Sequence, residues 1–193
     1  MAAEVTVTGN HLDRGDVRVT VTPFGPTDAQ LADLGARVVA HRAVRHRFTN
    51  GKARLLYVEA LEDEDQAAAT SPQVPTRFRA TIWDEAQQCA VYAEGGMDDL
   101  RGLTVTELAA APQPSQEEFD EAVELVRGDE TIGAAVRDGG RVPYQPIPAV
   151  HVEQLPDGGI QRRIAVGLIP RGAGERHEIV SVDLGDRSVH RAA

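Results

Sequence analysis

The sequence predicts an α+β protein built from two similar units, each a long helix followed by antiparallel strands. Two helix starts of the same kind, at Thr27 and Ser115, divide the 193 residues into halves. Each half continues with runs of alternating apolar and polar residues joined by short turns, the pattern of antiparallel hairpins. We therefore expect an N-terminal extension or edge strands at 1–25, a first unit at 26–110 and a second at 111–193.

The clearest helix of the chain begins after Ser115. This serine is a good N-cap, and Glu118 three residues later completes a capping box. Gly128 provides a stop for the helix. The apolar residues of this segment recur at helical spacing and form one stripe: Phe119, Ala122, Val123 and Val126. A helix with a single apolar stripe must cover a partner, and a sheet is the expected one.

The first half repeats this plan. Thr27 and Gln30 form a second capping-box pair, and the apolar spacing that follows predicts a helix over Asp28–Arg47. We expect strands at 53–61, 76–84 and 89–94, the last two joined as a hairpin, and a short strand within 100–108. The acidic and Pro-bearing segment between the first two strands predicts a loop.

Alternation within the 76–84 strand predicts one buried and one solvated face. Phe78, Ala80 and Ile82 should face the core, while Arg77, Arg79 and Thr81 should face solvent, as is common in antiparallel sheets. In the second half, strands are expected at 148–155, 160–170, 176–184 and 187–191, with the Asp157–Gly158 turn closing the first pair. Short strands are also expected at 4–8 and 17–21.

Each half thus reads as a helix, a strand, a hairpin of two long strands and a short final strand. One long helix across a curved antiparallel sheet is the cystatin-like arrangement. The sequence therefore predicts two cystatin-like units in tandem, because a repeated supersecondary unit is a common way to build a two-part fold.

Two segments in the middle of the chain carry a family resemblance. The segment 78–108 and the Pro-rich link and helix at 112–132 resemble the small amino-terminal domains of copper amine oxidases, as does VSVDLGDRSVHR near the end. In that family a helix of the form E-E-F/Y-x-x-A-x-x-x-V-R opens the second small domain. The matching residues here are Glu117, Glu118, Phe119, Ala122, Val126 and Arg127.

The resemblance implies the accessory domains of that family without its chemistry. In those enzymes a separate, larger domain carries a tyrosine that matures to topaquinone and a His-x-His copper pair. The three tyrosines of this chain stand in the contexts LYVE, VYAE and PYQP, and His-x-His does not occur. No catalytic residue and no cofactor are therefore carried over from the family.

Composition narrows the possible partners. The formal net charge of −10 disfavours nucleic acid as a partner. No apolar run approaches the ~20 residues that span a bilayer, and the first ten residues lack the pattern of a secretory signal. We therefore expect a cytoplasmic protein without membrane contact. The single Cys89 excludes an internal disulfide and is expected to be a small core residue of a strand.

The densest basic cluster lies near the end of the first expected helix and contains His41, Arg42, Arg45, His46 and Arg47. One interpretation is a docking site for an anionic ligand or acidic partner. The other is a solvated helix face balanced by the acidic loop at Glu62–Asp65. As a metal site the histidine pair is poor, because a separation of five residues turns about 140° around a helix.

Other candidates lie in the second half. His151, His177 and His190 all fall on expected strands and could converge on one face as a copper or zinc site, or supply a general acid or base. Alternation instead directs His151 and His190 to the polar face. Tyr144, which stands among prolines, is expected either to line a pocket or interface or to anchor its loop.

These observations predict a noncatalytic binding or scaffold protein. It would engage a protein or peptide through a sheet face or the cleft between its units, and could form a homodimer by covering exposed strand edges. The alternative is a small enzyme or metal-dependent protein with a site in a sheet concavity that uses His151, His177 or His190.

Overall fold

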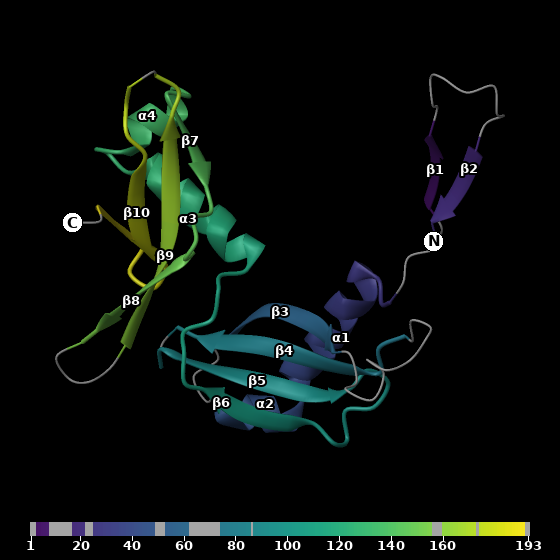
Figure 1. The fold of residues 1–193 in the computed structure, drawn as a ribbon. Coiled ribbons are helices and arrows are strands. Elements are labelled where there is room, and N and C mark those ends of the chain that lie inside the picture. The colour runs from purple at the N-terminus through teal and green to yellow at the C-terminus, as the bar shows by residue number, and fades with distance from the viewer. Residues whose placement is uncertain are drawn as a thin grey trace.

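The computed structural model confirms a mixed α+β fold with antiparallel sheets (Figure 1). It describes residues 3–7, 17–21, 25–48, 53–61, 74–85, 87–155, 160–172 and 174–191. At the N-terminus, β1 (Ala3–Val7) and β2 (Val17–Val21) pair antiparallel with each other. Both expected N-terminal strands are therefore present. The Asp157–Gly158 turn and the acidic segment Glu62–Asp65 lie outside the described residues.

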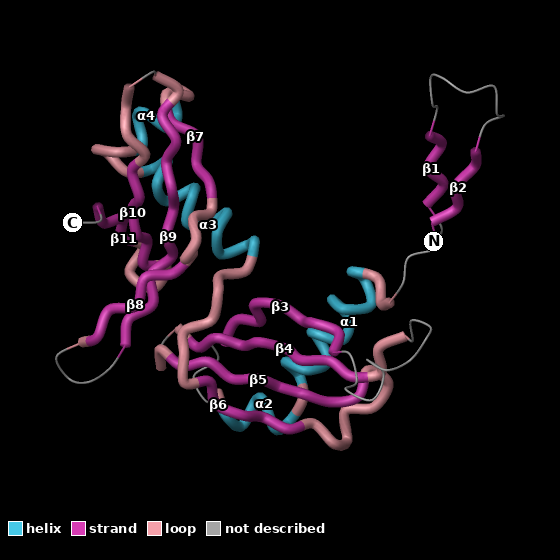
Figure 2. Tube along the Cα trace, in the orientation of Figure 1, coloured by secondary structure: helices cyan, strands magenta, loops and turns pink. Residues whose placement is uncertain are grey.

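The first helix is shorter than expected and is broken. α1 (Asp28–Ala40) begins at the Thr27 capping box, as the sequence predicts. The expected continuation to Arg47 is wrong because His41 adopts an extended backbone, with ψ 139°. The chain then restarts as α2 (Arg42–Arg47). Together the two helices cover one face of the first sheet, as Figure 2 shows.

The first sheet is a four-stranded meander. Its strands are β3 (Ala53–Leu61), β4 (Arg77–Asp84), β5 (Cys89–Gly96) and β6 (Thr104–Leu108), in the spatial order β3-β4-β5-β6. All four coincide with expected strands to within a few residues. Apolar side chains of α1, of α2 and of its C-cap Phe48 pack on one face of this sheet to form the first core: Leu34, Val38, Val44 and Phe48 against Phe78, Ala80, Ile82, Val91 and Ala93.

The other face of this sheet, which we call the outer face of the first sheet, is only partly solvated. Arg77 is exposed as predicted, and Arg79 is half-buried, but Thr81 is fully buried. Trp83, on the same face, is 1% exposed and packs with Leu56 and Ala90. The expectation of a solvated face fails at this end because residues from the second half of the chain cover Trp83.

The second half forms a similar assembly. α3 (Gln116–Gly128) begins at the Ser115 capping box and is followed by the C-cap Asp129, whose backbone N–H donates to the Leu125 and Val126 carbonyls. A short α4 (Gly133–Arg137) follows. The apolar stripe of α3 and the buried residues of α4 pack on one face of the second sheet to form the second core: Phe119, Ala122, Val126, Ile132 and Val136 with Ile164, Val166, Leu168, Val180 and Val182.

The second sheet has a divided edge. Its strands are β7 (Arg141–Tyr144), β8 (Val150–Gln154), β9 (Ile160–Pro170), β10 (Glu178–Asp183) and β11 (Ser188–Arg191). The order is β11-β10-β9, and β7 and β8 pair with successive parts of β9. The sequence did not predict β7, because the prolines around it indicated irregular structure; on an edge strand a proline is tolerated.

One arginine connects the two assemblies. Arg162 lies near the start of β9, and its side chain is 2% exposed. Its guanidinium makes two hydrogen bonds to the Glu118 carboxylate, at 2.8 and 3.1 Å, and a third to the Pro112 carbonyl at 3.0 Å. The same group lies over the Trp83 ring, 5.1 Å from its centroid. We call this set of contacts the Arg162 junction.

Further polar contacts surround the junction. The backbone N–H of Arg162 donates to the Gln88 side chain in the β4–β5 turn, at 2.9 Å. Glu121 of α3 accepts from Arg54 of β3 at 3.0 Å and from Arg187 at 3.2 Å. Glu118 is fully buried, so an unpaired carboxylate there would be strongly unfavourable, and Arg162 compensates it.

Candidate functional site

The basic residues of the expected docking site are brought together on α2. His41 has a structural task, because its Nδ1 accepts from the Ala43 N–H at 3.3 Å and so caps α2. Arg42 donates from Nε to His46 Nε2 at 3.1 Å. Arg47 forms an ion pair with Glu107 of β6. Arg45 is exposed, and its guanidinium makes no ion pair with a described residue.

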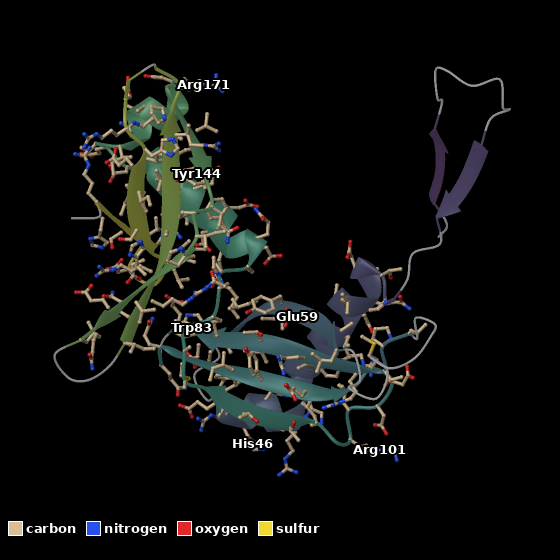
Figure 3. The ribbon with its side chains drawn as sticks, in the orientation of Figure 1. His46, Glu59, Trp83, Arg101, Tyr144 and Arg171 are labelled. Carbon is tan, nitrogen blue, oxygen red and sulfur yellow. The ribbon has the colours of Figure 1, made fainter. Side chains whose placement is uncertain are left out.

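A surface depression of about 700 Å³ lies beside these residues. It is lined by Val39, Ala40, Arg42, Val44, Arg45, His46 and Phe48. Val44 and Phe48 belong to the first core and are nearly buried, so they supply an apolar floor. In Figure 3, His46 lies on the opposite side of the first sheet from Glu59 and Trp83. The depression is therefore separate from the Arg162 junction.

Tyr144 lies in the second assembly and is not part of this basic cluster (Figure 3). It sits directly opposite Gly167 across the β7–β9 pair. A Cβ at Gly167 would come within 2.3 Å of the Tyr144 ring, so only glycine permits this close approach. The ring of His177 meets Tyr144 edge-on, with centroids 6.0 Å apart. Both expectations for Tyr144 are compatible with this placement.

Tyr144 contributes to a partly apolar surface. We define the outer face of the second sheet as the side opposite α3. Val142 pairs with Ile169, and Ile179 pairs with Gly167, so all three apolar side chains share this face with Tyr144. Val142, Ile169 and Ile179 are 37%, 36% and 36% exposed. Large aliphatic side chains exposed together on one sheet face are typical of a contact surface.

The three histidines considered as a metal site are not brought together by the sheet. His151 is on the β8 edge and His190 on the β11 edge, so three strand spacings, about 14 Å, separate them. His177 precedes β10 and was expected on a strand, but it contacts Tyr144 instead. Within the described residues, no cluster of three His, Cys, Asp or Glu side chains could hold a metal ion.

His190 has a hydroxyl neighbour. The Ser188 Oγ lies 2.7 Å from His190 Nε2 on the outer face of the second sheet. The same hydroxyl bonds the Asp186 carboxylate, which also accepts from the Ser188 backbone N–H at 2.9 Å. These contacts close the β10–β11 turn, so the serine has a structural role there. They are also the one place where a hydroxyl meets an imidazole in the described hydrogen bonds.

Titration is perturbed at the junction and on the outer face of the first sheet. Burial raises the pKa of Glu85, and its hydrogen bond from the Trp83 indole opposes this. Burial likewise raises the pKa of Tyr57, which is opposed by the Thr81 hydroxyl beside it. The Thr81 hydroxyl is buried but makes no hydrogen bond of normal geometry. Burial also raises the pKa of Cys89, which disfavours a reactive thiolate.

A second depression, of about 600 Å³, lies at the start of α1. Its lining combines apolar residues such as Leu31 and Met97 with Asp33, Arg37 and Asp98. Arg37 already faces Asp33 at 3.9 Å. Charges of both signs are therefore present here, in contrast to the depression beside α2.

Sequence reasoning missed the residues that connect the two assemblies. Arg162 stood within a strand with alternating polarity, where a charged residue indicates the solvated face. The signal that could have found it is the two-residue spacing along the strand. Arg162, Ile164 and Val166 are two residues apart, so Arg162 lies on the same face as the apolar residues. The apolar character of Ile169 and Ile179 was visible, but their exposure could not be derived from a single sequence.

No protein-family model matches this chain, and no curated protein matches it. None of the helices in the described part of the chain is long and apolar enough to cross a membrane.

Proposed function

We propose that this chain is a noncatalytic binding or scaffold protein that engages a protein or peptide partner through a sheet face. In this proposal the α1–β6 and α3–β11 assemblies are two cystatin-like units in tandem, and their resemblance to accessory domains of copper amine oxidases extends to this noncatalytic role. The observation that carries the proposal is the outer face of the second sheet, where Val142, Ile169 and Ile179 are exposed together.

The corresponding face of the first sheet supports this choice by contrast. Its Trp83 end is covered by Arg162, and its next row contains Tyr57, Thr81 and Tyr92. The first sheet thus uses its outer face to hold the second assembly. The cleft between the units is the weaker choice for a partner, because three contacts already occupy it: the Arg162 guanidinium over the Trp83 ring, the Arg162 N–H bond to Gln88 and the Arg54–Glu121 ion pair.

A peptide-display experiment tests the proposal. A random-peptide library is selected on the full chain, and the affinities of enriched peptides are measured for an Ile169→Lys/Ile179→Lys variant. We expect a loss of about tenfold or more, because burying an isoleucine contributes about 1.5–3 kcal/mol. A Val74→Lys variant, which changes a 63% exposed valine outside this face, is the matched control.

Three outcomes decide the matter. Selective loss in the double variant supports a sheet-face partner site. Enriched peptides that bind both variants equally, or a library without binders, reject it. If the wild-type chain is a dimer in sedimentation and the double variant is a monomer, the partner of this face is a second copy of the chain.

A second proposal is a small enzyme or metal-dependent protein that uses the polar part of the same sheet. The observation that favours it is the contact between Ser188 and His190. Metal analysis of the purified chain and labelling with a fluorophosphonate test it. Stoichiometric copper or zinc that His190→Ala removes, or labelling that Ser188→Ala abolishes, would support this alternative. The absence of both results would reject it.

A further inference from the structure

The depression beside α2 differs from the outer face of the second sheet in shape, charge and position. We propose that it is a separate docking surface for an acidic peptide segment that also carries an apolar side chain. This inference goes beyond the sheet-face function, because it concerns the first assembly instead of the second and a partner of different chemistry.

Charge is the first argument. The chain has 30 acidic and 20 basic side chains, yet no carboxylate belongs to the described lining of this depression. Its titratable lining residues are Arg42, Arg45 and His46. The carboxylate of Glu107 pairs with Arg47, the neighbouring arginine of α2. Arg42 and Arg45 therefore remain available to carboxylates from outside, which arginine binds with two parallel hydrogen bonds.

The position of the two arginines is the second argument. Arg42 and Arg45 are three residues apart on α2 and lie on neighbouring positions of one helix face. The contact between Arg42 Nε and His46 Nε2 holds the Arg42 side chain on this surface. Because the Arg42 side chain is already ordered, less conformational entropy is lost when a partner binds.

The floor of the depression determines the rest of the ligand. Val39 lies at its side, and the buried Val44 and Phe48 lie beneath it. A purely charged ligand would leave these apolar groups unused. An apolar side chain placed between two carboxylates would cover the accessible Val39 and Ala40 above this floor, as the anchor residue does in other peptide-recognition sites.

Nucleic acid is the less favoured occupant. A polyanion with a charge every few ångströms would approach a chain with a net charge of −10, and long-range repulsion would oppose it. A short peptide needs only the local cations. Phe48 in the lining of the depression is only 6% exposed, so it offers no open ring face on which a base could stack.

Fluorescence anisotropy with the full chain at low ionic strength tests the inference. The probes are fluorescein-labelled 12-residue peptides, one repeating Glu-Glu-Leu and one repeating Glu-Glu-Ser, and a dT12 oligonucleotide. We expect the leucine peptide to bind best, with the serine peptide about fivefold weaker because it lacks the apolar contact.

Two matched variants locate the site. Arg42→Glu/Arg45→Glu should weaken the leucine peptide by about tenfold or more. Arg101→Glu/Arg171→Glu reverses two exposed arginines elsewhere and should change the affinity less than about twofold. If the first double variant unfolds, Arg45→Gln replaces it and should still weaken binding measurably.

The outcomes are distinguishable from those of the sheet-face experiment. Ile169→Lys/Ile179→Lys should leave the leucine peptide bound with wild-type affinity. The inference is overturned if neither acidic peptide binds, if both arginine double variants lose affinity equally, or if the oligonucleotide binds more tightly than the peptides. It is also overturned if the leucine and serine peptides bind equally well.

Discussion

The two helix–sheet assemblies share a plan and differ in what their outer faces do. Each begins at a capping box and covers one sheet face with an apolar helix stripe. The outer face of the first sheet carries Trp83 under Arg162 and then rows of tyrosine, threonine and charged residues. The outer face of the second sheet carries exposed aliphatic residues instead. The first outer face contacts the neighbouring assembly, and the second leaves Val142, Ile169 and Ile179 exposed.

The helices differ as well. α1 and α2 are separated at His41, which places α1 over β3 and brings α2 to β6. α3 is uninterrupted and instead contributes Glu118 to the junction. The break in the first helix therefore creates the surface beside α2, while the unbroken second helix holds Arg162, whose guanidinium lies over Trp83 of the first sheet.

Replacing Arg162 should cause the largest loss in the free energy of unfolding. Arg162→Met leaves Glu118 buried and unpaired, and the free energy of unfolding should fall by about 3–5 kcal/mol in urea titrations. Arg162→Met/Glu118→Leu removes both charges and should recover much of this loss. A double variant no more stable than the single one would show that the loss comes from the ion pair or from the Ser115 N–H bond to Glu118, and not from the burial of a lone carboxylate.

Matched core substitutions should reveal whether the assemblies unfold together. Ile82→Ala in the first core and Ile164→Ala in the second should each cost about 2–5 kcal/mol. Because the junction joins the cores, we expect a single transition in which Trp83 fluorescence and far-ultraviolet circular dichroism coincide. If Ile164→Ala separates the two signals, the assemblies are independent units.

The two capping boxes offer a closer comparison. Ser115→Ala and Thr27→Ala should each lower the free energy of unfolding by about 1 kcal/mol. The Ser115 change should be the larger, because Ser115 is 8% exposed and its hydroxyl accepts from the backbone N–H of the buried junction residue Glu118. Thr106→Ala on exposed β6 is a control without a capping role. Equal losses at both caps would show that the Ser115 cap does not contribute to the stability of the junction.

The smallest effect should come from Glu85, whose pKa burial raises. A raised pKa in the folded state favours folding at low pH, and this contribution is lost as pH rises through the folded-state pKa. Glu85→Gln should therefore gain stability relative to wild type between pH 4 and pH 8. Thermal unfolding across this range checks it, with the exposed Glu117→Gln as the control. An unchanged difference across the range would contradict it.

Local signals predicted most of the fold. The capping boxes at Thr27 and Ser115 located both long helices, and alternation located the strands of both sheets. The break at His41 was missed because apolar spacing continues through it. β7 was missed because prolines disguise an edge strand.

The candidate sites were less accessible from sequence, for a physical reason. The basic cluster on α2 is local in the chain and was recognised. The Arg162 junction joins residues 44 and more positions apart, and only tertiary packing decides whether an arginine is solvated or buried. The same holds for Ile169 and Ile179, whose exposure depends on the absence of a cover over their face in the described structure.

The Arg162 junction has a consequence for the segment that joins the assemblies. The guanidinium bonds the Pro112 carbonyl and Glu118 at once, so residues 112–118 must keep a fixed length between their two contacts. Residues 112–115, which have no regular secondary structure, thereby act as a spacer of fixed length before α3. Insertions there should be tolerated far less well than insertions of equal size in the turn between β10 and β11, although both segments are loops.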